Sequence, residues 1–153
     1  DLGVPAFLVA ASTNIIIAQR LVRKVCPNCI QSYKLDKQTI IELKEQLDLE
    51  NIMRTLEEKK IIINAKQGKE ALLFYRGKGC KQCSNSGYKG RLGIYEVLEI
   101  TETMSELILK KASPADLKKQ AETQNMLTII EDGFIKAKNG ITTIEEIMRV
   151  TKE

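Results

Sequence analysis

The sequence predicts an α+β chain in which a cysteine-bearing subdomain is inserted between two strands and is followed by a small helical domain. Two stretches, at about 15–25 and 92–100, are rich in β-branched residues, as strands are. One Cys-x-x-Cys turn directly follows the first stretch, and a second such turn precedes the other. Beyond residue 100, helix start signals and helical spacing of apolar residues recur.

Composition sets limits on the function. The chain has 153 residues, 43% of them hydrophobic and 29% charged, which is a globular balance. It contains no histidine, which excludes Ser-His-Asp and Cys-His nucleophiles, imidazole proton shuttles and Cys2His2 metal sites. No stretch approaches the roughly 20 apolar residues that cross a bilayer, so we expect no transmembrane segment. The net charge of +4 is weak evidence for a polyanionic partner.

The first element expected is a short helix over residues 5–14, with Phe7, Leu8 and Ala11 on one face. A strand over about 15–25 follows, although a helix through this region is an alternative. If it pairs with the strand at 92–100, the two cysteine turns meet at the same end. The segment between the strands then becomes an insertion in a hairpin.

Within the insertion, an amphipathic helix is expected from Asp36 to about Leu47, because Ile40, Leu43 and Leu47 share one face. A second helix is expected over about 51–60. Short strands at 61–63 and 71–75, around a turn at 67–68, would complete the insertion.

The last third of the chain predicts helices near 102–112, 114–123, 128–139 and 143–150. Ser113 and Asp116 flank a proline at the first helical position, which is a strong start signal. Thr128 with Glu131, and Thr143 with Glu146, fit capping boxes, and Gly140 fits a helix C-cap. The core candidates are Leu107, Ile108, Leu117, Leu127, Ile130, Phe134 and Ile147.

The candidate metal ligands are the four cysteines of the chain, Cys26, Cys29, Cys80 and Cys83. Two Cys-x-x-Cys turns supply the four thiolates of a closed tetrahedral zinc site. Three alternatives remain open. Disulfides need an oxidising compartment, a redox motif needs only one cysteine pair, and a rubredoxin-type iron centre uses the same four ligands.

Basic residues surround the cysteines. They are Arg20, Arg23, Lys24, Arg76, Lys78, Lys81, Lys89 and Arg91. These cations would offset the net charge of about −2 of a zinc tetrathiolate and lower the pKa of the thiols, or they form a solvated basic face. Glycines that suit tight turns lie in the same stretches, at Gly77, Gly79, Gly87, Gly90 and Gly93.

Signatures of catalysis are missing from the sequence. It has no G-x-x-x-x-G-K-[ST] phosphate-binding loop. The glycine-rich run at 87–93 precedes a strand rather than a helix, and no pair of carboxylates stands out as acid and base. We therefore assign no catalytic residue and no residue that binds an organic cofactor.

Several longer segments carry a family resemblance. They are LGVPAF at 2–7, IIAQRLVRKVCPNC at 16–29, GKGCKQC at 77–83, GYKGRLGIYEVL at 87–98 and NGITTIEE at 139–146. Together they resemble the C-terminal part of the type II secretion and type IV pilus assembly ATPases of the extension-motor kind. The middle of the insertion, about 35–70, departs from the family pattern, so its role is not assigned.

The resemblance implies the end of a RecA-like domain, with an inserted tetracysteine zinc subdomain, followed by a small C-terminal helical domain. Residues 1–25 and 91–100 would complete the RecA-like domain, 26–90 would form the zinc subdomain, and 101–153 the helical domain. The full protein would be a hexameric ATPase at the cytoplasmic face of the inner membrane. Its partners would be the other ring subunits and a membrane platform protein.

The resemblance also places the Walker A, Walker B, Asp-box and His-box motifs upstream, so that ATP and Mg²⁺ would bind only the full-length parent. We expect the isolated chain to be cut from something longer, non-catalytic and monomeric. It would hold one zinc through Cys26, Cys29, Cys80 and Cys83 and bind no nucleic acid. The alternative function is a free-standing zinc-ribbon module that binds nucleic acid or acts as an adaptor. The segments do not separate pilus assembly from type II secretion.

Overall fold

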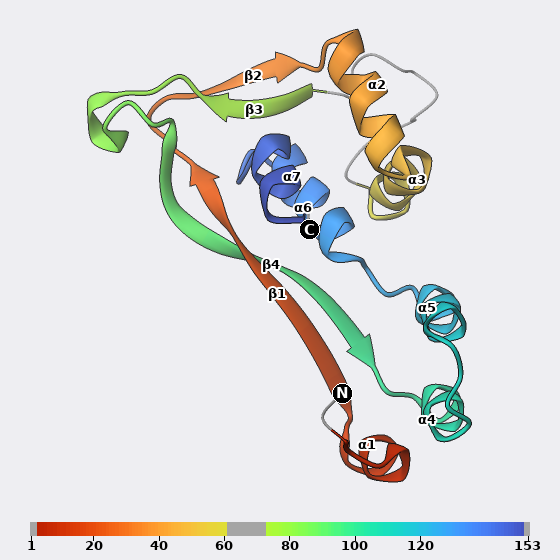
Figure 1. Cartoon of the computed structure of the whole chain (residues 1–153). Helices are drawn as coiled ribbons and strands as arrows, with labels where there is room; N and C mark the ends of the chain where they lie inside the picture. Colours follow the sequence, from red (N-terminus) through yellow and green to blue (C-terminus); the bar gives the residue numbers. More distant parts are fainter. Residues whose placement is uncertain (1–2, 61–72, 152–153) are drawn as a thin grey trace. The chain divides into compact units, whose positions relative to one another are not determined.

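The computed structural model describes residues 3–60 and 73–151 (Figure 1). The described elements are helices interspersed with short and long strands, so the α+β class is confirmed. In chain order they are α1 (Ala6–Ser12), β1 (Ile15–Val25), β2 (Ile30–Lys34), α2 (Lys37–Gln46), α3 (Leu49–Glu58), β3 (Leu73–Gly77), the 3₁₀ turn η2 (Lys81–Cys83), β4 (Tyr88–Glu99), α4 (Glu102–Leu109), α5 (Pro114–Thr123), α6 (Ile129–Lys138) and α7 (Ile144–Thr151).

The strands form two two-stranded sheets. β1 pairs with β4, as the sequence predicted, and their arrows run in opposite directions in Figure 1. β2 pairs antiparallel with β3, from Ile30 opposite Gly77 to Lys34 opposite Leu73. β2 was not expected, and β4 begins four residues before the predicted strand. The strand expected at 61–63 and the turn at 67–68 lie outside the described residues.

Most expected helices are present with shifted ends. Asp36 caps α2 by accepting a hydrogen bond from the Thr39 amide, and Asp48 does the same for α3 from Asn51. Ser113 and Asp116 form the expected capping box at α5. α4 ends at Leu109, earlier than expected, and Lys111 just beyond has a left-handed φ of 51°.

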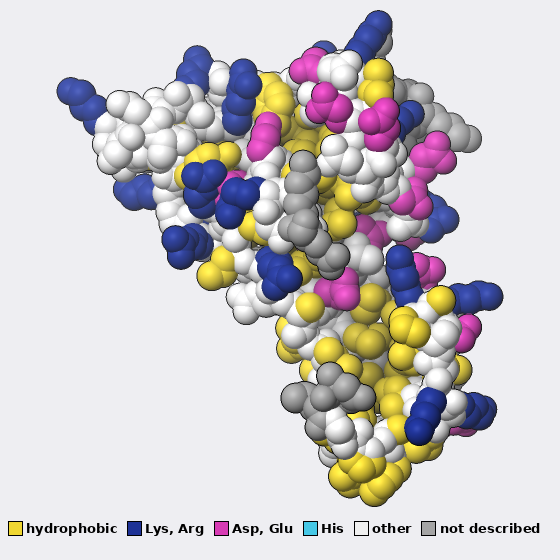
Figure 2. Space-filling model, in the orientation of Figure 1, with side chains coloured by type: hydrophobic (Ala, Val, Ile, Leu, Met, Phe, Trp, Pro, Cys, Tyr) yellow, Lys and Arg dark blue, Asp and Glu magenta, His cyan; other side chains and the backbone are white. Residues whose placement is uncertain are grey.

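The described chain divides into two compact units. One combines the residues up to Gln19 with Tyr95–Ile129, and the other combines Arg20–Ile94 with the residues from Ile130 onward. In the first unit α1 packs on α4, and α4 on α5. Hydrophobic side chains gather on its surface over α1 and the nearby strand ends (Figure 2). Phe7 and Ile17 are the most exposed, at 61% and 58%.

The second unit has one buried apolar cluster, to which α2, α3, β3, α6 and α7 contribute. Phe74 and Phe134 meet edge to face, with ring centroids 6.3 Å apart. The buried members of the cluster are Leu43, Leu49, Ile52, Leu56, Phe74, Phe134, Ala137, Ile144 and Ile147. The insertion helices therefore share a core with the last two helices of the chain.

This packing differs from the single bundle expected over 101–153. Phe134 and Ile147 are buried as expected, but they pack with the insertion helices. The other five core candidates are half-buried. α4 and α5 belong to one unit, and α6 and α7 to the other. The cause is that the apolar faces of α2 and α3 need a partner, which α6 and α7 supply. No helix in the described ranges is long and apolar enough to cross a membrane.

Candidate metal centre

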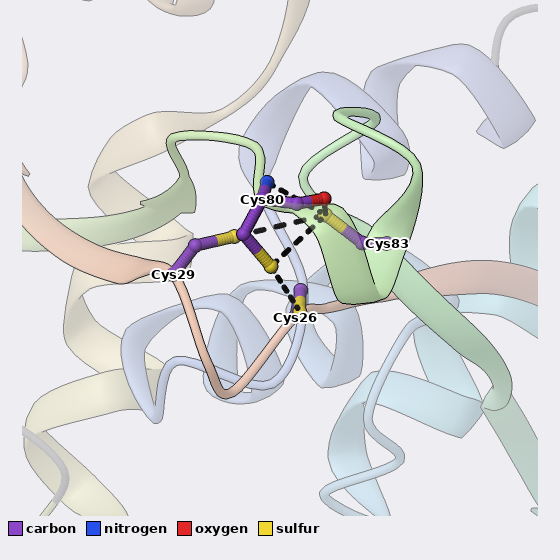
Figure 3. Close-up of side chains that lie close together, drawn as sticks. All are labelled: Cys26, Cys29, Cys80 and Cys83. Atoms are coloured by element: carbon purple, nitrogen blue, oxygen red, sulfur yellow. Dashed lines mark hydrogen bonds between the residues drawn. The ribbon is translucent and has the colours of Figure 1, made fainter.

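All four predicted ligands come together at one point, where the ends of four strands meet (Figure 3). Cys26 directly follows β1, and Cys29 directly precedes β2. Cys80 and Cys83 lie in the connection between β3 and β4, at the turn η2. Their sulfur atoms all lie within 4.8 Å of one another. The strand pairing expected from the sequence therefore does bring the two cysteine turns together.

The sulfur spacing fits a tetrahedral tetrathiolate. The Sγ atoms are 3.9 Å apart for Cys26 and Cys80, 3.9 Å for Cys29 and Cys83, and 3.7 Å for Cys80 and Cys83. A tetrahedral metal with metal–sulfur bonds of about 2.3 Å separates its sulfur ligands by about 3.8 Å. A disulfide would need about 2.05 Å, and all four cysteines are free thiols. The site can therefore hold a thiolate-binding metal ion, and the spacing is consistent with zinc.

Backbone amides point at the sulfur of Cys83. The amides of Cys80 and Gly87 donate to Cys83 Sγ at 3.2 and 3.3 Å. Burial raises the pKa of the Cys83 thiol, but the hydrogen bonds from these amides and from the Cys80 and Cys29 side chains together outweigh it, and the pKa falls to about 6. For Cys29 burial is the stronger effect and raises the pKa to about 12, against an opposing hydrogen bond from Gly79. The amides that point at Cys83 Sγ therefore stabilise its thiolate form.

Two glycines, Gly77 and Gly87, allow the backbone segments on either side of the second cysteine turn to approach each other. A Cβ atom on Gly77 would lie 2.1 Å from the carbonyl oxygen of Gly87. Gly87 itself has a φ of +77°, and a Cβ there would lie 2.7 Å from the Gly77 oxygen. The Gly87 carbonyl accepts a hydrogen bond from the Cys26 amide at 2.9 Å. This contact ties the first cysteine turn to the chain beside the second.

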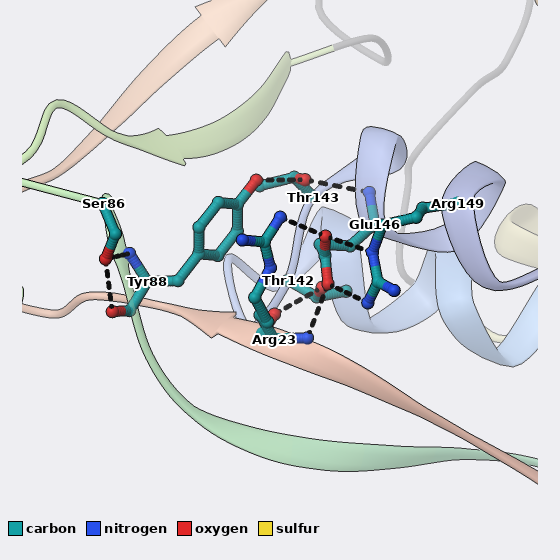
Figure 4. A network of polar contacts seen from close by, with 7 residues as sticks. All are labelled: Arg23, Ser86, Tyr88, Thr142, Thr143, Glu146 and Arg149. Atoms are coloured by element: carbon teal, nitrogen blue, oxygen red, sulfur yellow. Dashed lines mark hydrogen bonds and ion pairs between the residues drawn. The ribbon is translucent and has the colours of Figure 1, made fainter.

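A buried carboxylate lies close to the end of β1 (Figure 4). Glu146 of α7 is 1% exposed and pairs with Arg23 at 2.6 Å and Arg149 at 2.8 Å. Its oxygens also accept a hydrogen bond from the Arg23 amide at 2.9 Å. Burial would raise the pKa of Glu146, but the hydrogen bonds from Arg149 and Arg23 lower it to about 2. Arg23, expected to offset thiolate charge, therefore pairs with a carboxylate.

Three further side chains complete this network. The Arg23 guanidinium lies 4.2 Å from the centre of the Tyr88 ring, and Tyr88 Oη lies 3.1 Å from Thr143 Oγ1. Thr142 Oγ1 donates to the Arg23 carbonyl at 2.9 Å. Thr143 accepts from the Glu146 amide at 3.3 Å, as in the expected capping box, while the Glu146 carboxylate turns to the arginines. The network joins β1, β4 and α7 beside the cysteine turns.

Sequence reasoning missed this network because its members are far apart. Arg23 and Glu146 are separated by 123 residues. Glu146 was assigned a local role, because Thr-x-x-Glu is a helix start signal. One signal was present: Tyr88 is the only aromatic residue in the basic run that precedes the second strand.

Comparisons with known proteins cover the full length of the chain. A family model described as "Type II/IV secretion system protein" matches residues 1–149. The chain is 37% identical over 153 residues to the type II secretion system ATPase E of Vibrio cholerae. It is 35% identical over 153 residues to the type IV pilus assembly ATPase PilB of Pseudomonas aeruginosa, and equally so to that of Thermus thermophilus.

All of this chain is matched in these three relatives, but it spans only 26%, 24% and 15% of their respective lengths. The match to the family model extends over nearly the whole sequence, including both cysteine turns and the residues of the Glu146 network. The chain belongs to the type II/IV secretion system protein family.

Proposed function

We propose that the chain is the C-terminal zinc-binding and helical region of a hexameric ATPase that powers type IV pilus assembly or type II protein secretion. The observation that carries the proposal is that four cysteine sulfurs lie within 4.8 Å of one another in a chain of this family. The relatives are named as ATPases of these two systems, and the chain matches about a quarter of the length of the first two. In this proposal ATP and Mg²⁺ bind elsewhere in the full-length protein.

The chain itself is proposed to be non-catalytic. Its sequence has no phosphate-binding loop of the G-x-x-x-x-G-K-[ST] type. Among the residues that the structure describes, two glutamates of the second unit are buried, and both are engaged in structural contacts. Glu146 pairs with two arginines, and Glu131 accepts hydrogen bonds from Thr55 at 2.6 Å and Asn51 at 3.2 Å. Neither is placed as a free general base.

Cys26, Cys29, Cys80 and Cys83 would hold the zinc, which has a structural rather than a chemical role at a closed site of four protein ligands. Cys26 and Cys29 lie between the end of β1 and the start of β2, and Cys80 and Cys83 lie in the connection from β3 to β4. Binding free energies of structural zinc sites are on the order of 10 kcal/mol. Such a site would hold the four strand ends in one arrangement and let the subdomain transmit force without deforming.

Residues 1–25 and 91–100 are proposed to complete the edge of the RecA-like domain. The exposed apolar residues on α1 and β1, including Phe7 and Ile17, support this because monomer surfaces rarely expose large contiguous apolar patches. The resemblance gives the proposed family limits as 1–25 with 91–100, 26–90 and 101–153, and the last region packs through α6 and α7 on the insertion helices α2 and α3. The proposed partners are neighbouring ring subunits and an inner-membrane platform protein. The location is then cytoplasmic and peripheral at the inner-membrane face.

The experiment compares the 153-residue chain with the full-length protein that contains it. We expect the full-length protein to sediment as a hexamer with nucleotide and to hydrolyse ATP. The chain alone should sediment as a monomer and show no turnover with Mg-ATP. Turnover by the chain alone would overturn its non-catalytic role. Salt-dependent binding of DNA or RNA by the chain, measured by fluorescence anisotropy, would favour the zinc-ribbon alternative.

A further inference from the structure

A cavity of about 360 Å³ lies in the second unit and is lined by three arginines and a leucine. β1 contributes Leu21 and Arg23, which are two residues apart and so lie on the same face of the strand. β4 contributes Arg91, and α7 contributes Arg149. No carboxylate is among the described residues that line this cavity.

Two of the arginines are held in place by hydrogen bonds to Glu146. Arg23 donates to Glu146 through Nη2, and Arg149 through Nε and Nη2. The Tyr88 ring lies against the Arg23 guanidinium and restricts its plane. Yet the two arginine side chains remain 47% and 52% exposed, and neither Nη1 donates to Glu146. Each guanidinium therefore keeps donors for a ligand, and its position is already fixed.

The charges around the cavity do not cancel. Arg23, Arg91 and Arg149 bring three positive charges, and Glu146 neutralises one, which leaves a net charge of +2. Arg91 is exposed, and no carboxylate of the described residues forms an ion pair with it. A phosphate group carries a charge of about −1.5 to −2 at neutral pH. Guanidinium groups bind its oxygens through paired hydrogen bonds.

We propose that this arginine cavity is a binding site for a phosphate dianion, either free or as the terminal phosphate of an ester. Arg91 supplies donors that form no ion pair with any carboxylate of the described residues. Arg23 and Arg149 supply donors whose positions are fixed by Glu146. None of the cavity residues is a cysteine of the metal centre or within two residues of one. The proposal therefore stands independently of the proposed function.

The test is a titration of the zinc-loaded chain with sodium phosphate at constant ionic strength, followed by calorimetry and ³¹P NMR. We expect saturable binding of one phosphate per chain. Arg91→Gln should weaken it by about tenfold or more, the effect of losing a charge-assisted hydrogen bond. Lys89→Gln is the matched control, because Lys89 is also an exposed cation on β4 but does not line the cavity. Its affinity should stay within about twofold of the unsubstituted chain.

A parallel titration with AMP identifies the source of the phosphate. Tighter binding of AMP than of inorganic phosphate supports a site for phosphate esters, and the reverse supports a site for the free anion. Absence of saturable binding for both probes would overturn the proposal. An equal loss of affinity in Lys89→Gln and Arg91→Gln would also overturn it, because binding would then follow net charge rather than the cavity.

Discussion

Replacing Glu146 with glutamine should destabilise the chain strongly, because this carboxylate is the buried centre of the network at the end of β1. Its pKa falls from an ordinary value of 4.5 to about 2 in the folded chain. A tenfold change in an acid dissociation constant corresponds to about 1.4 kcal/mol. The ionised carboxylate therefore contributes about 3 kcal/mol to the free energy of unfolding at neutral pH. A neutral amide at this position would also turn its N–H donors toward the two arginines.

The assay is urea unfolding of Glu146→Gln at pH 7, followed by far-UV circular dichroism. The matched control is Glu145→Gln, the same change at the preceding, exposed residue. We expect a loss of about 3 kcal/mol for Glu146→Gln and less than about 0.5 kcal/mol for Glu145→Gln. If both variants unfold within about 0.5 kcal/mol of the unsubstituted chain, the network does not contribute as the structure indicates.

Three further results are expected. The stability difference between the unsubstituted chain and Glu146→Gln should be constant above about pH 5. It should shrink as pH falls from about 4.5 toward 2, because a lowered folded-state pKa gives stability that is lost on acidification; a difference unchanged at pH 2.5 would contradict this. Gly87→Ala should weaken metal retention against a chelator. Gly90→Ala is the control, because Gly90 has a similar φ of +80° but no contact closer than 3.9 Å, so this change should lower the free energy of unfolding by only about 1 kcal/mol. Equal effects of the two changes on metal retention would contradict the close approach of Gly77 and Gly87. Phe134→Ala should lower the free energy of unfolding by about 3–5 kcal/mol, and Phe7→Ala by less than about 0.5 kcal/mol. Similar losses for the two variants would contradict the placement of Phe134 in the core of the second unit.

The parts of the fold that follow from local pattern were predicted correctly. β1 spans the residues expected from its alternating, β-branched sequence. The clustering of the four cysteines follows from their spacing and from the pairing of β1 with β4, which brings the two turns to one end. The caps at Asp36 and Ser113 are encoded within three residues, so they are visible in the sequence.

The parts that depend on distant partners were not predicted. β2 is a short strand with the sequence IQSYK, and its register is set by β3, whose paired residues lie 39 to 47 positions further along the chain. The packing of α2 and α3 on α6 and α7 requires knowing which apolar faces meet, and helical periodicity shows only that each face exists. The Arg23–Glu146 pair has the same origin, because each residue has a plausible local role when seen alone.

Four thiolates are proposed to hold one zinc at the meeting point of the strands. Elemental analysis of the chain purified without added metal, with thiols counted before and after chelation, tests this site. We expect about one zinc per chain, four thiols that are unreactive before chelation, and four released together with the metal. Iron in place of zinc would contradict the identity of the metal. Metal-free protein with four reactive thiols, or with two disulfides, would contradict the site itself.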